Sequence, residues 1–300
     1  MTSQTFRAGL VQMCSGRTIA DNVQEATRLI REAKAGGAEY IQTPEVTTQM
    51  ERDRDKLLVE TLPEDGNPSL AHFRTLAREL KIWLHIGSMA VAVGGGQLAN
   101  RALLIGPTGA VAARYDKIHM FDVQLPNGEH YRESRNFKPG AEAVIADLPW
   151  GKLGLSICYD LRFAALYRTL AQAGAQILAI PSAFTKPTGH AHWHTLMRAR
   201  AIETGCFVLA AAQAGKHENG RETFGHSLVV SPWGEIIAEA GIEPGVVFAD
   251  IDLAKVGEAR AQVPSLQHDR TFVLRAVAPL AARETSLPAA NAPRAVREST

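Results

Sequence analysis

Cysteine is scarce in this sequence of 300 residues. Only Cys14, Cys158 and Cys206 occur, an odd number, and they are widely spaced without a Cys-x-x-Cys pair. These features argue against a disulfide framework and against a zinc site held by cysteines. A reducing, cytoplasmic location is therefore the expectation.

The chain also lacks an excess of either charge, because 32 basic residues balance 31 acidic ones to give a net charge of +1. We therefore expect neither nucleic acid nor a membrane surface among its partners. No stretch approaches the roughly 18 apolar residues of a membrane span, and the first residues do not resemble a signal peptide. The glycines of VAVGGGQLAN form no Gly-x-Gly-x-x-Gly motif that opens a helix, so we expect no cofactor.

What the sequence does contain is an alternation of short apolar runs and amphipathic segments, with 46% hydrophobic residues overall. The runs have the length of strands, and the amphipathic segments have helical spacing. Asp21 is the predicted N-cap of the first helix. The alternation indicates an α/β fold with two sheets, each covered by helices. Strands are predicted at 7–13, 38–45, 82–92, 101–109, 152–157, 176–182, 206–213, 226–234, 235–240 and 245–252, and helices at 22–37, 68–81, 162–175 and 192–205.

A chain of this length suits one large α/β domain. We place that domain at residues 1–278, because no linker or change of composition interrupts this range. Residues 279–300 are rich in Ala, Pro, Arg, Ser and Thr and show no periodicity, which indicates a C-terminal extension or tail.

Cys158 stands where the apolar run 152–157 ends and a helix is predicted to begin. A thiol at such a strand-to-helix turn lies beside the free amides of a helix start, which is the geometry of a nucleophile elbow. A buried structural cysteine is the alternative. Cys14 and Cys206 fit that alternative, because both are predicted to lie inside strands.

Two further strand ends carry the groups that a catalytic thiol needs. Glu45 ends the run 38–45, and Lys117 follows a strand-like run directly. A glutamate can accept the proton of the thiol, and an ammonium group can stabilise the oxyanion that forms on a substrate carbonyl. Each charge alone is typical of a solvated surface, but the three groups together indicate a catalytic site.

The blocks TPE around Glu45, YDKIHMFD around Lys117 and CYDLRF around Cys158 resemble the three signature blocks of the nitrilase superfamily of carbon–nitrogen hydrolases. Their order and separations are similar to those of the family, and the resemblance extends from about residue 6 to about residue 274. It implies a single-domain α/β fold built as a four-layer αββα sandwich that commonly forms dimers.

Within the superfamily, the blocks at 184–213 and 224–240 resemble the branch of deaminated-glutathione amidases and ω-amidases. Glu133 matches the second glutamate of that branch. The segment HAHWHT departs from the branch, because it adds His190 and His194 to the expected His192–Trp193 pair. This departure leaves the identity of the substrate more open than the chemistry.

The resemblance implies that Cys158 attacks an amide carbon while Glu45 takes the thiol proton. Lys117 and the backbone N–H of Tyr159 stabilise the oxyanion, and ammonia leaves to give a thioester that water hydrolyses. Glu133 orients Lys117 or the bound amide. The same resemblance implies substrate contacts by Tyr159, Arg162, His192 and Trp193.

The expected substrate is a small molecule, the primary ω-amide of a small carboxylic acid. A nitrile or an N-carbamoyl compound is the alternative. Arg162, Lys186 and Arg198 are candidate seats for the substrate carboxylate, each with a structural or solvated role as its alternative. Asp160 and Arg162 are expected to pair with each other, because charged groups near a buried turn need partners. A homodimer or larger homo-oligomer is also expected, formed through the apolar helix at 163–171.

Three other interpretations fit the sequence less well. His190, His192 and His194 can suggest a metal site, but helical spacing brings only the first and last together, and no carboxylate or cysteine follows nearby. We therefore expect no metal. A Cys–His protease using His119 or His226 lacks a protease signature, and a non-catalytic scaffold leaves the Glu, Lys and Cys blocks unexplained.

Overall fold

The computed structural model describes residues 4–125 and 128–276. The chain divides into two units, Met1–His268 and Asp269–Thr300. In the second unit, the described residues 269–276 form neither helix nor strand. The predicted domain boundary between residues 278 and 279 lies outside the described residues.

The first of two six-stranded sheets has the order β16-β1-β2-β3-β4-β5. Strands β1, β2 and β3 are parallel, whereas β16, β4 and β5 each run antiparallel to their neighbours. Crossover helices join the parallel strands, as parallel pairing requires. The bounds are β1 Thr5–Gln12, β2 Tyr40–Gln42, β3 Trp83–Gly94, β4 Gln97–Ile105, β5 Val111–Asp116 and β16 Gly245–Asp252.

The second sheet has the order β15-β14-β11-β10-β9-β8 and repeats this plan. Strands β9, β10 and β11 are parallel at its centre, and the remaining pairs are antiparallel. The bounds are β8 Val144–Asp147, β9 Lys152–Leu155, β10 Ile177–Ala179, β11 Phe207–Ala210, β14 Leu228–Val230 and β15 Ile236–Glu239.

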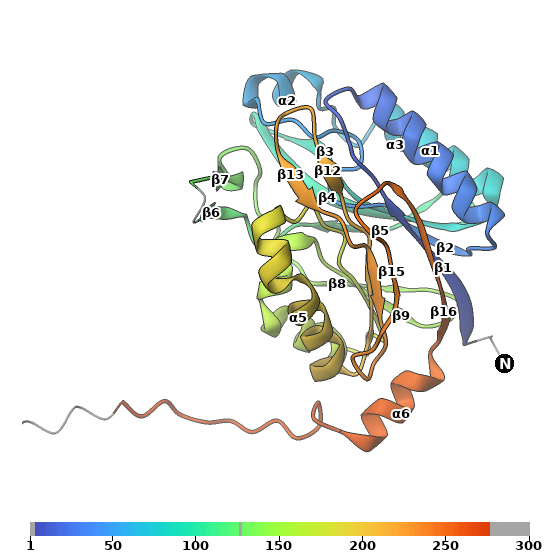
Figure 1. Ribbon diagram of the computed structural model, residues 1–300, viewed down its shortest axis with the longest axis vertical. Helices are drawn as coiled ribbons and strands as arrows, with labels where there is room; N and C mark the ends of the chain where they lie inside the picture. Colours follow the sequence, from blue (N-terminus) through green and yellow to red (C-terminus); the bar gives the residue numbers. More distant parts are fainter. Residues whose placement is uncertain (1–3, 126–127, 277–300) are drawn as a thin grey trace, which may run out of the picture. The chain divides into compact units, whose positions relative to one another are not determined.

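Helices cover the outer face of each sheet, while the inner faces share one core (Figure 1). The alternation along β1 shows this: Leu10 belongs to the core between the sheets, and the next residue, Val11, packs under α1 and α3. The predicted four-layer αββα sandwich is therefore confirmed. The covering helices are α1 Ile19–Ala35 and α3 Pro68–Leu80 on the first sheet, and α4 Ala164–Gln172 and α5 Lys186–Thr204 on the second.

Several local features differ from the sequence-based expectations. The first helix begins three residues earlier than predicted, so Thr18 is its N-cap and Asp21 lies in its first turn. Cys14 lies beyond the end of β1, and Cys206 precedes β11, so neither cysteine is inside a strand. The elements not predicted are helices α2 Arg54–Glu60 and α6 Ala254–Gln262, strand β8, and the hairpins β6 Asp122–Gln124 with β7 His130–Arg132 and β12 Ala214–Lys216 with β13 Glu222–Phe224.

Among the helices that the structure describes, none combines the length and the apolar character needed to cross a bilayer.

Candidate active site

Three strand ends meet at one cavity of about 750 Å³. Glu45 lies in the turn after β2, Lys117 directly follows β5, and Cys158 follows β9 after two intervening residues. All three line the cavity. Since β2 and β5 belong to one sheet and β9 to the other, the cavity draws its polar side chains from both halves of the sandwich.

Gly87 of β3 lies where the two sheets approach each other closely, beside these strand ends. A Cβ atom at this position would lie 2.1 Å from the Thr43 carbonyl oxygen and 2.5 Å from the Pro181 Cβ. The Gly87 N–H donates to Thr43 Oγ1 at 3.1 Å. Glycine is therefore required for the turn that carries Glu45 to approach the end of β10.

Cys158 occupies a strained backbone conformation at the turn between β9 and α4. Its φ is +47°, in the left-handed region that residues other than glycine rarely adopt. Its N–H donates to the Pro181 carbonyl at 2.9 Å, and Asp160 Oδ2 accepts from the Ile157 N–H at 2.9 Å. The turn continues as a 3₁₀ helix, Cys158–Arg162, whose first amides have no partner within the helix. The predicted strand-to-helix elbow is thus present.

Asp160 is fully buried and ties the elbow to the lysine segment. Its Oδ2 accepts from the Tyr115 hydroxyl at 2.6 Å, and its Oδ1 accepts from the His119 backbone N–H at 3.0 Å. These two partners flank Lys117 in the sequence. The predicted pairing of Asp160 with Arg162 is wrong, because the carboxylate is engaged by the segment around Lys117 instead.

Lys117 lies between two carboxylates. Its Nζ donates to Glu45 Oε1 at 2.8 Å and to Glu133 Oε2 at 2.8 Å. Asn100 of β4 donates from Nδ2 to both acids, at 3.0 Å to Glu45 and 3.1 Å to Glu133. The other oxygen of Glu45 accepts from the Ala183 N–H at 2.9 Å. The structure thus brings the predicted Glu45, Lys117 and Glu133 together.

The charges of this cluster stabilise one another. Burial is the largest single influence and raises the pKa of the Glu45 carboxyl, but the charge and hydrogen bond of Lys117, together with the charge of Arg221, hold that pKa below its usual value. Burial likewise lowers the pKa of Lys117, but Glu133 and Glu45 raise it well above the ordinary value. At neutral pH Glu45 is therefore a carboxylate and Lys117 an ammonium group.

The Cys158 thiol is protonated in this environment. Burial is the main cause that raises the pKa of Cys158, and the negative charge of Glu45 adds to it, while Lys117 opposes both. The thiol therefore loses its proton only when a nearby base accepts it, and Glu45 is close enough for the two groups to shift each other's pKa. This arrangement suits coupled proton transfer and nucleophilic attack better than a stable thiolate.

A model of the carbon–nitrogen hydrolase family matches residues 7–261 of the chain. The chain belongs to this family.

Relatives of this hydrolase include a deaminated glutathione amidase of Synechocystis, 40% identical over 272 residues, or 89% of this chain and 99% of the relative. An omega-amidase of Homo sapiens is 38% identical over 272 residues, covering 90% and 96% of the two chains. The solved structure of Saccharomyces cerevisiae Nit3, a member of branch 10 of the nitrilase superfamily, matches with a TM-score of 0.79 and 28% identity. That match covers 88% of this chain and 96% of the other. The predicted superfamily and an amidase activity are thereby confirmed.

An arginine that the sequence analysis missed lines the cavity of the hydrolase. Arg221, in the β12–β13 hairpin, lies over the Tyr131 ring at 5.2 Å, and Arg52 lies over the same ring at 5.3 Å. Arg221 donates to the Ala183 carbonyl, but its buried Nε has no hydrogen-bond partner. Within residues 4–125 and 128–276, no carboxylate forms an ion pair with Arg221.

Of the four predicted substrate contacts, only Tyr159 lines the cavity. Trp193 is fully buried and donates from Nε1 to the His226 carbonyl at 2.8 Å, so its role is structural. Arg162 lies outside the lining, over the rings of Tyr159 and Phe184, with its guanidinium 3.3 Å from His192 Nδ1. Trp193, Arg162 and His192 do not line this cavity, so the structure does not support them as direct contacts, and their role toward substrate stays a prediction.

The other two candidate seats for a carboxylate are also engaged elsewhere. Lys186 pairs with Glu222 at 3.0 Å, and Arg198 donates to the Gly234 carbonyl at 2.8 Å. Neither residue lines the cavity. Lys186 and Arg198 therefore fit the structural or solvated roles given as the alternatives.

The remaining cysteines lie outside the cavity. The Cys14 Sγ lies 3.7 Å from His217 Nδ1, but that nitrogen also lies 2.9 Å from the Ser15 carbonyl oxygen, and burial raises the pKa of the Cys14 thiol. Cys14 is exposed, whereas Cys206 is buried with its Sγ 3.2 Å from the Ala175 carbonyl. His119 lies against Asp160, outside the lining around Cys158. A Cys–His protease is therefore not supported by the geometry.

Proposed function

We propose that this hydrolase cleaves the terminal primary amide of a small molecule that also carries a carboxylate, of the ω-amide or deaminated-glutathione type. The observation that carries the proposal is the cavity itself, which is lined by a thiol, a base, an ammonium group and Arg221, an arginine without an ion pair among the described residues. The amidases among the relatives support the same reaction.

In the first half of the reaction, Cys158 Sγ forms a bond to the amide carbon while its proton passes to Glu45. Lys117, with the Tyr159 N–H at the start of the 3₁₀ helix, stabilises the oxyanion. Glu45 then gives the proton to the amide nitrogen, the C–N bond breaks, and ammonia leaves a thioester behind. The buried setting favours these steps because charge interactions are strongest where water is excluded.

In the second half, Glu45 takes a proton from a water molecule, and the resulting hydroxide attacks the thioester carbon. The C–S bond breaks, the carboxylic acid is released, and the proton on Glu45 returns to the Cys158 sulfur. Glu133 holds Lys117 in place through two hydrogen bonds, at 3.0 and 2.8 Å. We assign it a positioning role, with its carboxylate also able to accept a hydrogen bond from an amide N–H₂.

Arg221 is the proposed seat for the substrate carboxylate. A guanidinium binds a carboxylate in bidentate fashion, and Arg221 lines the cavity without an ion pair to a carboxylate of the described residues. An anionic group of the substrate would supply that ion pair. The proposal therefore favours acid amides over neutral amides and nitriles.

A panel of substrates tests the proposal. We expect kcat/KM for α-ketoglutaramate or deaminated glutathione to exceed that for a neutral amide of equal length and for an aliphatic nitrile. In Arg221→Gln, the KM for the acid amide should rise about 10-fold or more, from the loss of a charged hydrogen bond, whereas the KM for the neutral amide should stay the same. Arg198→Gln is the matched control and should change neither. Faster turnover of the nitrile or of an N-carbamoyl compound would reject the substrate class.

The proposal includes a cytoplasmic location, because a reducing compartment keeps the free thiols of the chain available. It also includes a homodimer, but not through the apolar residues of α4 on which the sequence argument rested. Leu166, Tyr167 and Leu170 of that helix are buried in the core of their own chain. Sedimentation velocity at micromolar concentration tests the assembly, and a monomer there contradicts it.

A further inference from the structure

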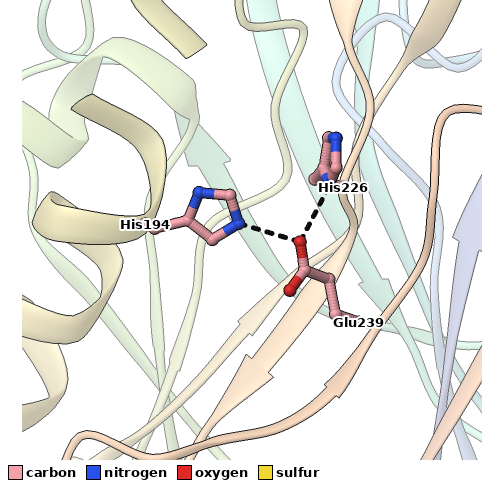
Figure 2. A group of neighbouring side chains, drawn as sticks. All are labelled: His194, His226 and Glu239. Atoms are coloured by element: carbon pink, nitrogen blue, oxygen red, sulfur yellow. Dashed lines mark hydrogen bonds and ion pairs between the residues drawn. The ribbon is translucent and has the colours of Figure 1, made fainter. Parts of the chain in front are cut away.

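Two histidines and a glutamate meet away from the cavity, at the surface of the second sheet (Figure 2). His194 comes from α5, His226 from the residues just before β14, and Glu239 from the end of β15. His194 Nε2 and His226 Nδ1 lie 2.8 and 2.7 Å from the same oxygen, Glu239 Oε1. The expectation from the sequence concerned only His190, His192 and His194, with no carboxylate beside them. For His194 this expectation is wrong, because the fold brings Glu239 to it from a distant strand.

The backbone around His226 holds this imidazole in a fixed place. His226 has a φ of +56°, a left-handed conformation that needs support from its surroundings. Its N–H donates to the Gly241 carbonyl at 3.0 Å, and its carbonyl accepts from the buried Trp193 at 2.8 Å. Its ring stacks on Phe224 with centroids 4.4 Å apart. The position of the His226 imidazole is therefore fixed before any ion binds.

The other two side chains can adjust and are open to solvent. The side chains of His194 and Glu239 are 37% and 31% exposed, against 26% for His226. The three ligand atoms lie within 4.8 Å of one another. Bonds of about 2.0–2.2 Å from two imidazole nitrogens and one carboxylate oxygen are typical of zinc sites that keep a fourth position for water. Small shifts of the exposed Glu239 and His194 make room for such an ion.

We propose that His194, His226 and Glu239 bind one divalent cation of the zinc class, with water as the fourth ligand. Each imidazole coordinates in its neutral form, with its proton on the ring nitrogen that faces away from Glu239. The ion takes the place of the two hydrogen bonds to Glu239 Oε1. Among the residues that the structure describes, this is the one cluster of three such ligand atoms.

The proposed ion joins α5 to β14 and β15 and does not touch the reacting groups. None of the three ligands lines the cavity that contains Cys158, so the inference stands apart from the proposed amidase function. Thr188, in the first turns of α5, does line that cavity. We therefore expect the ion to stabilise the helix that borders the cavity, with its main effect on thermal stability.

Zinc binding is best measured in full-length Cys14→Ala/Cys158→Ala protein, which lacks the exposed thiol and the cavity thiol. Titration with Zn²⁺ against a chromophoric chelator should give one equivalent per chain and a rise in Tm. Co²⁺ should give the visible absorption bands of a four-coordinate site. His194→Ala and Glu239→Gln, added to this background, should each weaken binding at least 10-fold and remove the Tm rise.

His190→Ala is the matched control, because His190 lies one turn away on α5 without joining the cluster. It should retain the full equivalent and the Tm rise. Equal Zn²⁺ affinity in the background protein, His194→Ala and Glu239→Gln overturns the proposal, as does the absence of any bound equivalent in the background protein. Circular dichroism of the variants shows whether an affinity loss comes from misfolding, and Glu239→Gln keeps the size of the side chain it replaces.

Discussion

Cys158 depends on its neighbours for reactivity, because burial and the charge of Glu45 both raise the pKa of its thiol. A low-pKa thiolate would react with many electrophiles, whereas a buried thiol reacts only when a substrate lies beside it and a neighbouring base takes its proton. At the scale of single residues, the proposed chemistry thus depends on a proton that passes between Cys158 and Glu45. Cys14 does not line this cavity.

We predict that Cys158→Ala lowers kcat at least about 10⁴-fold, because the thioester path is lost and only binding and oxyanion stabilisation remain. The Tm should change little, since the removed sulfur is a single atom. Ammonia release and thermal melting measure the two effects. Cys14→Ala serves as the control and should keep full activity. Equal loss in both variants would contradict the assignment of the nucleophile.

The acid limb of the pH profile should report Glu45. Against burial, Lys117 and Arg221 together hold the pKa of Glu45 below its usual 4.5, so the folded protein keeps this base ionised in mildly acidic solution. A folded pKa below the unfolded one contributes stability above pH 4.5, and this contribution is lost as pH falls through the folded value. We expect the acid limb of kcat/KM below pH 4.5, measured after brief exposure to each pH. A limb above that value, in protein that is still folded, contradicts the shift.

At the scale of secondary-structure elements, the site depends on the close contact between three segments, which are β3, the turn after β2 and the end of β10. Gly87→Ala places a Cβ atom against the Thr43 carbonyl and Pro181, so we expect a loss of about 1–3 kcal/mol in the free energy of unfolding. Activity should fall further than stability, because the displaced turn carries Glu45. Gly245→Ala at the start of β16 meets no atom within 4 Å and should be nearly neutral. Urea unfolding and ammonia release compare the two variants.

The sequence predicted the strand ends that carry chemistry, because short apolar runs bounded by Glu45, Lys117 and Cys158 are visible along the chain. Asn100 and Arg221 were missed for different reasons. Asn100 interrupts an apolar strand and becomes informative only when Glu45 and Glu133 are placed beside it. Arg221 lies in a short hairpin among Gly, Asn and charged residues, a composition typical of surface turns.

The walls of the cavity were the least predictable part of the site. Helix α2 and strand β7 both contribute lining residues, and both are too short to show a clear periodicity. The cluster of His194, His226 and Glu239 was hidden for a related reason. Its members come from three elements that only the fold brings together, so spacing within HAHWHT carries no information about Glu239.

At the scale of the whole molecule, we expect the folded part that carries the hydrolase activity to end near residue 268. The family model stops at residue 261, and the Synechocystis relative aligns over 99% of its own length but only 89% of this chain. We predict that a chain ending at His268 keeps kcat/KM within about two-fold and Tm within a few degrees. Ammonia release and calorimetry on the two forms test this. A large loss of either quantity contradicts the boundary.

The pair of carboxylates around Lys117 has a consequence for the end of the reaction. An amide enters the cavity with a neutral reacting group, but the proposed reaction leaves a new carboxylate beside Glu45 and Glu133, whose charges Lys117 only partly offsets. The same wall that accepts the substrate therefore repels the product. The cluster therefore favours release of the acid product over its rebinding. Weak inhibition of the reaction by its acid product is the expected result.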